Sequence, residues 1–344
     1  MKAVRFHEYG KYPVVEEVPE PTVSGPLDVL VEVAGAGVCR MDQEVIDGKW
    51  AREVVLTPPL TLGHENAGWV REVGSAVTNV VPGDAVILHP LVTCGLCRPC
   101  WSGDDVHCEN SEFAGFDRPG GMAELLVTHA RSVVTLPHTV EPAEVAWLAD
   151  AGLVAYHAVR KALPLLHPGT CLVVLGTGGL GQVGLQCAMA LTPAEVVVVD
   201  FSQGVLSKAD ELGAHHTVTA NHQQVEAVRQ LTSGRGANVV LDFAVDKGSG
   251  EAGIAMLRRA GSYFAIGSTG GLVLPTTEII SAEINVVSKF SGSHNDLEEL
   301  MILVHEGEIR LDAEHYRIDG IVDALRDLDN DRVRGWPVLV PTAA

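Results

Sequence analysis

Residues 170–200 read Thr170-Cys-Leu-Val-Val-Leu-Gly176-Thr-Gly178-Gly-Leu-Gly181-Gln-Val-Gly-Leu-Gln-Cys-Ala-Met-Ala190-Leu-Thr-Pro-Ala-Glu195-Val-Val-Val-Val-Asp200. An apolar run leads into a glycine-rich turn, a helix-forming segment follows, and a second apolar run ends in an acid. This order predicts a strand, a helix and a second, parallel strand. Because parallel strands joined by helices build doubly wound sheets, the stretch predicts an α/β fold.

The glycine-rich turn has the spacing of a dinucleotide-binding motif, and its position between a strand and a helix is the context that such a motif requires. Gly176 allows the tight turn, Gly178 lets the backbone approach a pyrophosphate, and Gly181 permits close packing of helix on strand. Gly179 and Leu180 open the helix, whose free N–H groups and partial positive charge favour phosphate. The turn therefore predicts a nucleotide cofactor.

The acid that closes the second apolar run, Asp200, selects between the two nicotinamide dinucleotides. Its carboxylate accepts hydrogen bonds from ribose hydroxyls in sites of this kind. The same negative charge repels a 2′-phosphate. We therefore expect NAD rather than NADP as the cofactor.

Strand and helix patterns continue downstream of this unit and change character upstream of it. Helix 205–212, the β-branched pair at 217–218 and the apolar runs 239–243 and 262–267 extend the alternation of a doubly wound sheet. Residues 1–150 instead contain short alternating runs separated by glycines, which predicts a compact β domain. Residues 144–162 read as helical, with a split around Gly152, and we place the domain crossing there.

Four cysteines lie close together in the segment 91–110: Cys94, Cys97, Cys100 and Cys108. Three of them are spaced by two residues, and glycines and a proline supply tight turns. Structural zinc prefers a closed tetrahedral site with four thiolates, so the segment predicts a structural zinc lobe. The alternatives are a pair of disulfides, or a redox-active pair, which needs a strand–helix setting that this loop lacks.

Bulk properties limit the partners and the cell compartment. The 344 residues suffice for two domains, and the net charge of −20 argues against nucleic acids and anionic membranes as partners. The first residues contain no apolar signal segment, and no apolar run approaches the ~20 residues of a membrane span. We therefore expect a soluble cytoplasmic protein. Cys171 and Cys187 lie in apolar runs and are interpreted as core residues.

Two further motifs complete a family signature. Cys39 and the run Gly63-His64-Glu65-Asn66-Ala67-Gly68 lie upstream of the four-cysteine segment, and the glycine turn lies downstream. Together these motifs resemble the zinc-dependent medium-chain alcohol dehydrogenases over essentially the whole chain. The resemblance implies a GroES-like β-barrel catalytic domain at 1–150, a Rossmann NAD-binding domain at 151–290, and a C-terminal segment, 291–344, that returns to the catalytic domain.

The resemblance also implies a catalytic zinc besides the structural one. Its ligands would be Cys39, His64 and Asp150, which leaves a fourth position for water or the substrate oxygen. Glu65 would be an alternative ligand or would support the ligands from behind. Asp42 would accept the second N–H of His64 and fix its tautomer. The apolar residues that would line a substrate pocket, unless they serve packing alone, are Trp50, Leu91, Phe113 and Phe116.

The implied function is an oxidoreductase that transfers hydride between NAD(H) and a secondary alcohol or ketone, or a primary alcohol or aldehyde. The partner is then a small-molecule substrate, and the chain forms a homodimer or homotetramer through the edge of the cofactor-domain sheet. The alternatives are a polyol dehydrogenase, a zinc-free or weakly active reductase of the same superfamily such as a quinone reductase, and a non-enzymatic nucleotide-sensing or scaffold protein.

The chain departs from the family pattern at three positions. Met41 replaces a hydroxyl residue that passes the alcohol proton outward, and a thioether cannot relay a proton. We hypothesise that a water chain involving Glu44 replaces it. Val154 replaces a threonine beside the nicotinamide, and Val205 replaces a basic residue at the adenosine ribose. Arg40 aligns with a position that touches the pyrophosphate in some relatives, or is a surface arginine.

Overall fold

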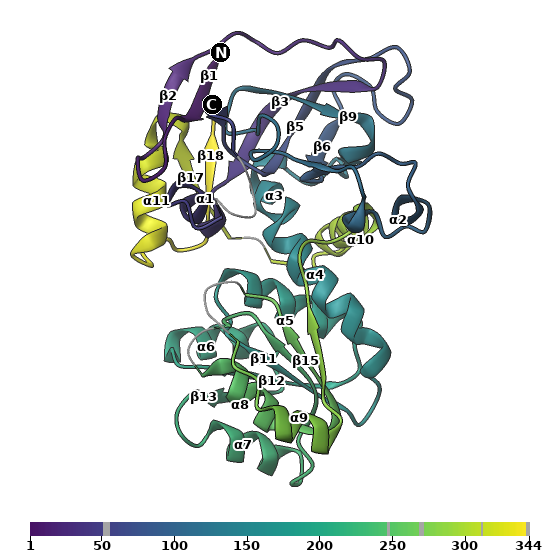
Figure 1. The fold of residues 1–344 in the computed structure, drawn as a ribbon, viewed down its shortest axis with the longest axis vertical. Helices are drawn as coiled ribbons and strands as arrows, with labels where there is room; N and C mark the ends of the chain where they lie inside the picture. Colours follow the sequence, from purple (N-terminus) through teal and green to yellow (C-terminus); the bar gives the residue numbers. More distant parts are fainter. Residues whose placement is uncertain (51–55, 246–247, 268–271, 311, 342–344) are drawn as a thin grey trace. The chain divides into compact units, whose positions relative to one another are not determined.

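The computed structural model describes residues 1–50, 56–245, 248–267, 272–310 and 312–341. The chain divides into two compact units. Unit 1 comprises Met1–Ala151, Ser293–His305 and Arg310–Ala344, and unit 2 comprises Gly152–Gly292 and Glu306–Ile309. In Figure 1 the purple, blue and yellow parts of the ribbon, which include both ends of the chain, belong to unit 1. The middle of the chain, residues 152–292 in teal to green, forms most of unit 2.

Unit 2 is built on a six-stranded sheet in the order β13-β12-β11-β14-β15-β16, with every neighbouring pair parallel. Its strands are β11 (Cys171–Leu175), β12 (Glu195–Asp200), β13 (His216–Thr219), β14 (Ala237–Asp242), β15 (Leu257–Ala265) and β16 (Asn285–Ser288). The chain adds strands on one side of β11 as far as β13, then adds β14 on the other side. This reversal confirms the predicted doubly wound fold.

The helices of unit 2 lie before the first of these strands and between successive ones (Figure 1). They are α4 (Ala151–Ala162), α5 (Gly179–Leu191), α6 (Gln203–Glu211), α7 (Gln224–Leu231), α8 (Ser249–Met256) and α9 (Thr276–Ala282), with a 3-10 turn η4 (Leu163–Leu165). All five residues of β11 are buried. Parallel sheets are covered on both faces, which explains why this strand is a continuous apolar run rather than an alternating one.

Unit 1 contains a seven-stranded sheet in the order β10-β6-β5-β3-β18-β17, with β9 also paired to β3. A three-stranded sheet, β2-β1-β4, and a two-stranded sheet, β7-β8, complete it. The strands are β1 (Lys2–Phe6), β2 (Val14–Glu17), β3 (Asp28–Gly37), β4 (Leu60–Thr61), β5 (Glu65–Val73), β6 (Ala85–Leu88), β7 (Leu91–Val92), β8 (Glu112–Phe113), β9 (Leu125–His129), β10 (Val133–Thr135), β17 (Ala313–Arg317) and β18 (Trp336–Val340).

Short helices close unit 1. The α-helices are α1 (Arg40–Ile46), α2 (Arg98–Trp101), α3 (Pro142–Val145), α10 (His294–His305) and α11 (Ile321–Asp329), and the 3-10 turns are η1 (Asp105–His107), η2 (Ala130–Ser132), η3 (Ala146–Ala149) and η5 (Ile318–Gly320). The C-terminal strand β18 pairs antiparallel with β3, at Val338↔Gly37. None of the helices among the described residues has the length and apolar character needed to cross a membrane.

The break in the helical segment, which the sequence predicts around Gly152, lies at a different residue. Gly152 is inside α4, and the chain breaks before it, at Asp150, whose φ of −124° and ψ of −60° are not helical. The N–H of Ala151 leaves the helical pattern and donates to a Glu65 carboxylate oxygen at 3.0 Å. A side-chain acceptor on another strand therefore sets the break, rather than the flexibility of glycine.

Two glycines in first helical turns of unit 2 allow a matched stability test. A Cβ at Gly181 would collide with the carbonyl oxygen of Gly176, whereas a Cβ at Gly204 would meet only Ser202 Oγ, at 3.9 Å. We expect Gly181→Ala to lower the free energy of unfolding by about 1–3 kcal/mol through overpacking. Gly204→Ala is expected to raise it by about 0.4–1 kcal/mol through the unfolded state. Urea unfolding measures both, and equal effects would contradict the close packing at Gly181.

Candidate functional site

Cys39 is fixed at the junction of β3 and α1 by a capping arrangement. It is the N-cap of α1, and its Sγ accepts the N–H of Met41 at 3.4 Å. In return, Asp42 Oδ2 accepts the N–H of Cys39 at 2.9 Å. This reciprocal pattern satisfies two N–H groups of the helix start and orients the thiol. It also places Asp42, which is 2% exposed, inside unit 1.

His64 and Glu65 precede and begin β5, and both side chains are fully buried. Glu65 Oε1 accepts the N–H of Ala151, and its Oε2 accepts the indole N–H of Trp336 at 2.9 Å. Glu65 thus joins β5 to the start of α4 and to the C-terminal strand β18. Trp336 was not predicted from the sequence, because it lies 271 residues from Glu65 and no local pattern marks it.

The His64 ring lies between two carboxylates. Its Nδ1 is 3.4 Å from Asp42 Oδ1, and its Nε2 is 3.7 Å from Asp150 Oδ2. Neither buried ring nitrogen has a well-formed hydrogen bond to any described residue. The rings of Phe113 and Phe116 pack beside the imidazole, with centroids 5.7 Å and 5.6 Å away. The structure therefore gathers the predicted residues of this site around a buried imidazole.

The donors around His64 fit a divalent cation. Donor atoms of Cys39, His64 and Glu65 all lie within 4.8 Å of one another, and Asp150 approaches this group through His64. Burial, and then the neighbouring Glu65 carboxylate, raise the pKa of the Cys39 thiol to about 12. Burial likewise raises the pKa of Glu65 to about 8. Burial thus favours the neutral forms of both groups, and a cation is what would stabilise the ionised forms; thiolate, imidazole and carboxylate are the ligands of zinc.

The charge state of His64 supports the same interpretation. Burial acts to lower its pKa, but the Asp42 carboxylate, together with Cys39, raises the pKa well above the ordinary value. The surrounding acidic groups thus favour a positive charge at this position. Because a metal ligand must be deprotonated, a bound zinc would displace this proton and take over its electrostatic role.

The four-cysteine lobe has the dimensions of a single tetrahedral site. Its four sulfurs lie within 4.8 Å of one another, and Cys97 Sγ is 3.4 Å from Cys100 Sγ and 3.9 Å from Cys108 Sγ. Four sulfurs at about 2.3 Å from one ion are separated by about 3.8 Å. All seven cysteines are free, so the alternative of two disulfides within the lobe is not present. The lobe therefore fits the predicted zinc.

Backbone N–H groups of the lobe stabilise thiolates. Leu96 N donates to Cys94 Sγ at 3.4 Å, and Cys94 N and Asn110 N donate to Cys108 Sγ at 3.2 Å and 3.4 Å. The N–H of Leu96 lowers the pKa of Cys94 to about 6. Supporting hydrogen bonds of this kind orient ligands and tune metal affinity.

The glycine turn between β11 and α5 has the predicted shape. Gly176 has a φ of +75°, and a Cβ at Gly178 would meet nothing within 4 Å. Open space in front of Gly178 is what a pyrophosphate needs. Gly179 and Leu180 are the first two residues of α5, where N–H groups have no acceptor within the helix. The turn therefore fits a dinucleotide phosphate.

Asp200 supports this turn from the neighbouring strand β12. Its Oδ2 accepts the N–H of Thr177 at 2.9 Å, and its Oδ1 accepts the N–H of Ser202 at 2.9 Å. Asp200 is 6% exposed, and the next residue, Phe201, is 79% exposed. The acid thus holds the middle of the glycine turn, in addition to its predicted contact with ribose.

The remaining predicted residues lie in varied surroundings. Arg40 is half-exposed, and its guanidinium forms an ion pair with Asp331 at 2.6 Å within unit 1. Glu44 Oε2 accepts the indole N–H of Trp50 at 2.9 Å, and Met41 is half-buried against the core. The roles predicted for Arg40 at the pyrophosphate and for Glu44 in proton transfer stay predictions.

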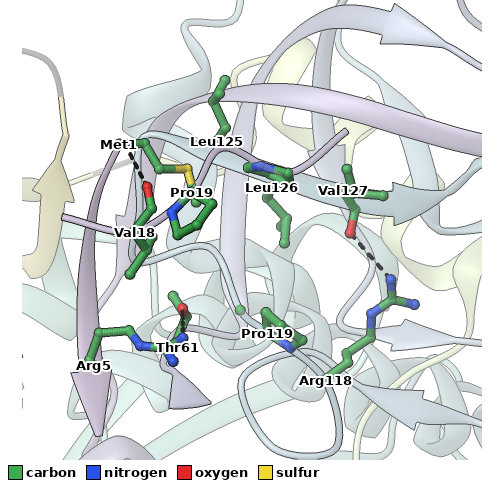
Figure 2. Close-up of a pocket in the computed structure, with 12 residues that line it drawn as sticks. Met1, Arg5, Val18, Pro19, Thr61, Arg118, Pro119, Leu125, Leu126 and Val127 are labelled. Atoms are coloured by element: carbon green, nitrogen blue, oxygen red, sulfur yellow. Dashed lines mark hydrogen bonds between the residues drawn. The ribbon is translucent and has the colours of Figure 1, made fainter. Parts of the chain in front are cut away.

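A pocket of about 340 Å³ opens elsewhere on unit 1, between β1 and residues 118–127 (Figure 2). Arg5, Arg118, Pro19 and Leu126 are among its lining residues. The Arg5 guanidinium donates to Thr61 Oγ1 at 2.9 Å, and Arg118 donates to the Val127 carbonyl at 3.3 Å. None of the metal-site donors lines this pocket, so it does not mark the reaction site.

The chain is similar to known proteins over almost its whole length. Residues 25–138 match the family described as Alcohol dehydrogenase GroES-like domain, and residues 179–306 match Zinc-binding dehydrogenase. The NAD-dependent alcohol dehydrogenase of Sulfurisphaera tokodaii is 30% identical over 99% of this chain and 100% of that protein. D-arabinose 1-dehydrogenase (NADP(+)) of Saccharolobus solfataricus is 31% identical over 99% of this chain and 97% of that protein. The alcohol dehydrogenase structure from Aeropyrum pernix is 40% identical, with a TM-score of 0.93 and coverage of 99% and 100%.

Replacing one lobe cysteine tests the metal assignment there. We expect Cys97→Ser to lower the zinc content of the purified chain and to lower its Tm by several degrees, because metal-binding free energy is folding free energy in such lobes. Cys171→Ala is the matched control, since this core cysteine is 5% exposed and belongs to no donor group among the described residues. Metal analysis and calorimetry measure both variants. An unchanged zinc content in Cys97→Ser would contradict the zinc lobe.

Proposed function

Because the chain belongs to the medium-chain dehydrogenase/reductase family and its zinc-binding alcohol dehydrogenases, we propose that it transfers hydride between NAD(H) and a small alcohol or carbonyl compound. The observation that carries this function is the buried donor group of Cys39, His64 and Glu65, with Asp42 and Asp150 on either side of the imidazole. A zinc-free reductase of the superfamily has no need of such a group.

We propose two zinc ions per chain, one in the four-cysteine lobe and one at His64. Cys39, His64 and Asp150 would hold the second ion, with Glu65 as the alternative carboxylate. Asp150 is preferred because both Glu65 oxygens already accept N–H groups, from Ala151 and Trp336. Zinc, when bound, supplies a Lewis acid that lowers the pKa of an alcohol hydroxyl.

The chain's own residues prepare this site for the reaction. The Asp42 carboxylate faces Nδ1 of His64, so the proton stays on that nitrogen and Nε2 faces Asp150. Phe113 and Phe116 cover the imidazole and exclude water, which strengthens the electrostatic interactions of the site. Met41 offers no hydroxyl, so the alcohol proton must leave by another polar route.

Cofactor choice rests on residues at the end of β12. The Asp200 carboxylate repels a 2′-phosphate, and the next side chain, the exposed Phe201, carries no charge. Val205 adds no cation in the first turn of α6. NADP sites use an arginine in this neighbourhood. These residues therefore support NAD over NADP.

The edge of the unit 2 sheet supports a homodimer or homotetramer. Its last strand, β16, has no further neighbour among the described strands, and apolar side chains around it are exposed. Ile280 is 72% exposed, Phe290 is 55% exposed and Val286 is 38% exposed. An exposed apolar sheet edge is a surface that a second copy of the chain can extend.

A substrate panel tests the function. We expect secondary alcohols to be oxidised with NAD, measured as NADH absorbance, at a kcat/KM at least about tenfold above that with NADP, because the Asp200 carboxylate opposes the 2′-phosphate. Chelation should abolish turnover, and added zinc should restore it. Turnover that survives removal of zinc would contradict the proposal. If the chain oxidises D-arabinose or a polyol in preference, its function would instead be that of a sugar or polyol dehydrogenase.

Two carboxamide variants distinguish the roles of the two carboxylates. We expect Asp150→Asn to lose most of its zinc and activity, because it removes a charged ligand. Glu65→Gln should keep more zinc but lose about 1–3 kcal/mol of stability, because the new NH2 group faces an N–H donor. Zinc content, kcat and Tm measure this split, and Asp331→Asn at the exposed ion pair with Arg40 is the control. The reverse pattern would make Glu65 the ligand.

A further inference from the structure

A second buried acid lies at the end of the strand on the other side of the glycine turn. Asp242 is the last residue of β14, next to β11 in the sheet, and it is 0% exposed. Its Oδ1 accepts the N–H groups of Ala244 at 3.0 Å and Val245 at 2.8 Å. Its Oδ2 accepts the hydroxyl of Tyr263 at 2.6 Å. One carboxylate therefore ties the loop after β14 to the neighbouring strand β15.

This carboxylate holds the loop in an unfavourable conformation. Val245 has a φ of +40°, in the left-handed region that β-branched residues avoid, and it is 5% exposed. Such a conformation persists only where surrounding contacts require it. The hydrogen bonds from the Ala244 and Val245 N–H groups to Asp242 are such contacts. The hydrogen bond from Tyr263 in turn fixes the carboxylate that accepts them.

Tyr263 is itself positioned by small residues on α8. It is fully buried, and a Cβ at Gly253 would lie 2.8 Å from its ring. At Gly250 the nearest Tyr263 atom to such a Cβ would be the hydroxyl oxygen, at 3.5 Å. The two glycines therefore make room for a tyrosine whose hydroxyl reaches the end of the next strand.

The loop that Asp242 shapes lies at the reversal point of the sheet. Strand order reverses between β11 and β14, and open α/β sheets bind their ligands outside the carboxyl ends of the strands at this point. The glycine turn forms one side of it, and residues 243–245 form the other. The two are in contact, since Phe243 N donates to Leu175 O at 2.9 Å and a Cβ on Gly176 would lie 2.8 Å from Ala244 Cβ.

We propose that Asp242 and Tyr263 are positioning residues for the nicotinamide half of the cofactor. The proposal rests on the proposed function, in which NAD lies over the glycine turn. Asp200 assigns the adenosine half to the β12 side of that turn, so the other half extends over the β14 side. The Tyr263–Asp242 hydrogen bond holds residues 243–245 in the shape that this half meets.

Tyr263→Phe removes the hydroxyl and keeps the ring. We expect the Kd for NADH to rise about tenfold, the factor that corresponds to one hydrogen bond of about 1.4 kcal/mol. The Kd for AMP, which probes the adenosine half alone, should change less than about twofold, because Asp200 is untouched. Fluorescence or calorimetric titration of the zinc-loaded chain measures both, and thermal unfolding checks that the variant is folded.

Two further variants separate positioning from general destabilisation. Asp242→Asn keeps an acceptor for the Ala244 and Val245 N–H groups and should retain most of the NADH affinity. Val245→Gly accepts a positive φ without strain, so in its background Tyr263→Phe should weaken NADH binding by less than about twofold. Tyr316→Phe is the matched control, because this tyrosine also donates to an aspartate, Asp327 Oδ2 at 3.2 Å, but within unit 1.

The outcomes are distinguishable. Failure of the wild-type chain to bind NADH would overturn the proposed function. Wild-type binding together with an unchanged NADH Kd in Tyr263→Phe would overturn only the positioning role. Equal weakening of AMP and NADH, or the same loss in Tyr316→Phe, would also overturn it. Should Tyr263→Phe not fold, the decision falls to Asp242→Asn and Val245→Gly, of which the first must keep NADH affinity and the second must keep Tm.

Discussion

Charge compensation at one buried imidazole constrains unit 1 most strongly. His64 is fully buried, and a thiol and three carboxyl groups, those of Asp42, Glu65 and Asp150, lie around it. The ionised forms of these buried acidic groups are stable only when positive charge balances them. A divalent cation with sulfur, nitrogen and oxygen ligands would meet that requirement, and the same ion would supply the Lewis acid of the proposed alcohol oxidation.

The requirement explains the topology around the site. Cys39 follows β3, His64 precedes β5, Asp150 interrupts the helical segment before α4, and Trp336 begins β18. These positions are far apart in sequence, so only the completed sheet brings them together. The hydrogen bonds of Glu65 to Ala151 and Trp336 then join the middle and the end of the chain to the first half. The C-terminal strand thus fixes Glu65, one of the donors of the proposed metal site.

Unit 2 also contains buried carboxylates, and there they accept hydrogen bonds from backbone N–H groups of loops. Asp200 and Asp242 end the two strands that flank β11, and each binds backbone N–H groups of a loop at the edge of the sheet. Backbone groups in such loops lack partners from regular secondary structure, and a buried carboxylate can satisfy two at once. The acids therefore fix the loops on both sides of the proposed cofactor site, at the carboxyl ends of the central strands.

Sequence patterns predict those features whose residues act locally. The glycine turn and the four-cysteine lobe are each complete within a short segment, and the comparisons confirm the family and fold class that they predict. Contacts between distant segments leave no local pattern, which is why Trp336, Tyr263 and the helix break at Asp150 were not predicted. Sequence spacing also cannot decide between Asp150 and Glu65 as the ligand, because the direction of each carboxylate relative to His64 is set only by folding.

X-ray absorption at the zinc edge of the purified, fully loaded chain tests the central claim most directly. Zinc in the lobe would be coordinated by sulfur alone, whereas zinc at His64 would be coordinated by one sulfur together with nitrogen and oxygen. The account predicts an averaged first shell with sulfur at about 2.3 Å and a clear nitrogen or oxygen contribution at about 2.0–2.1 Å. A shell of sulfur alone would contradict it, because zinc would then occupy only the lobe and the acids around His64 would have no metal to compensate them.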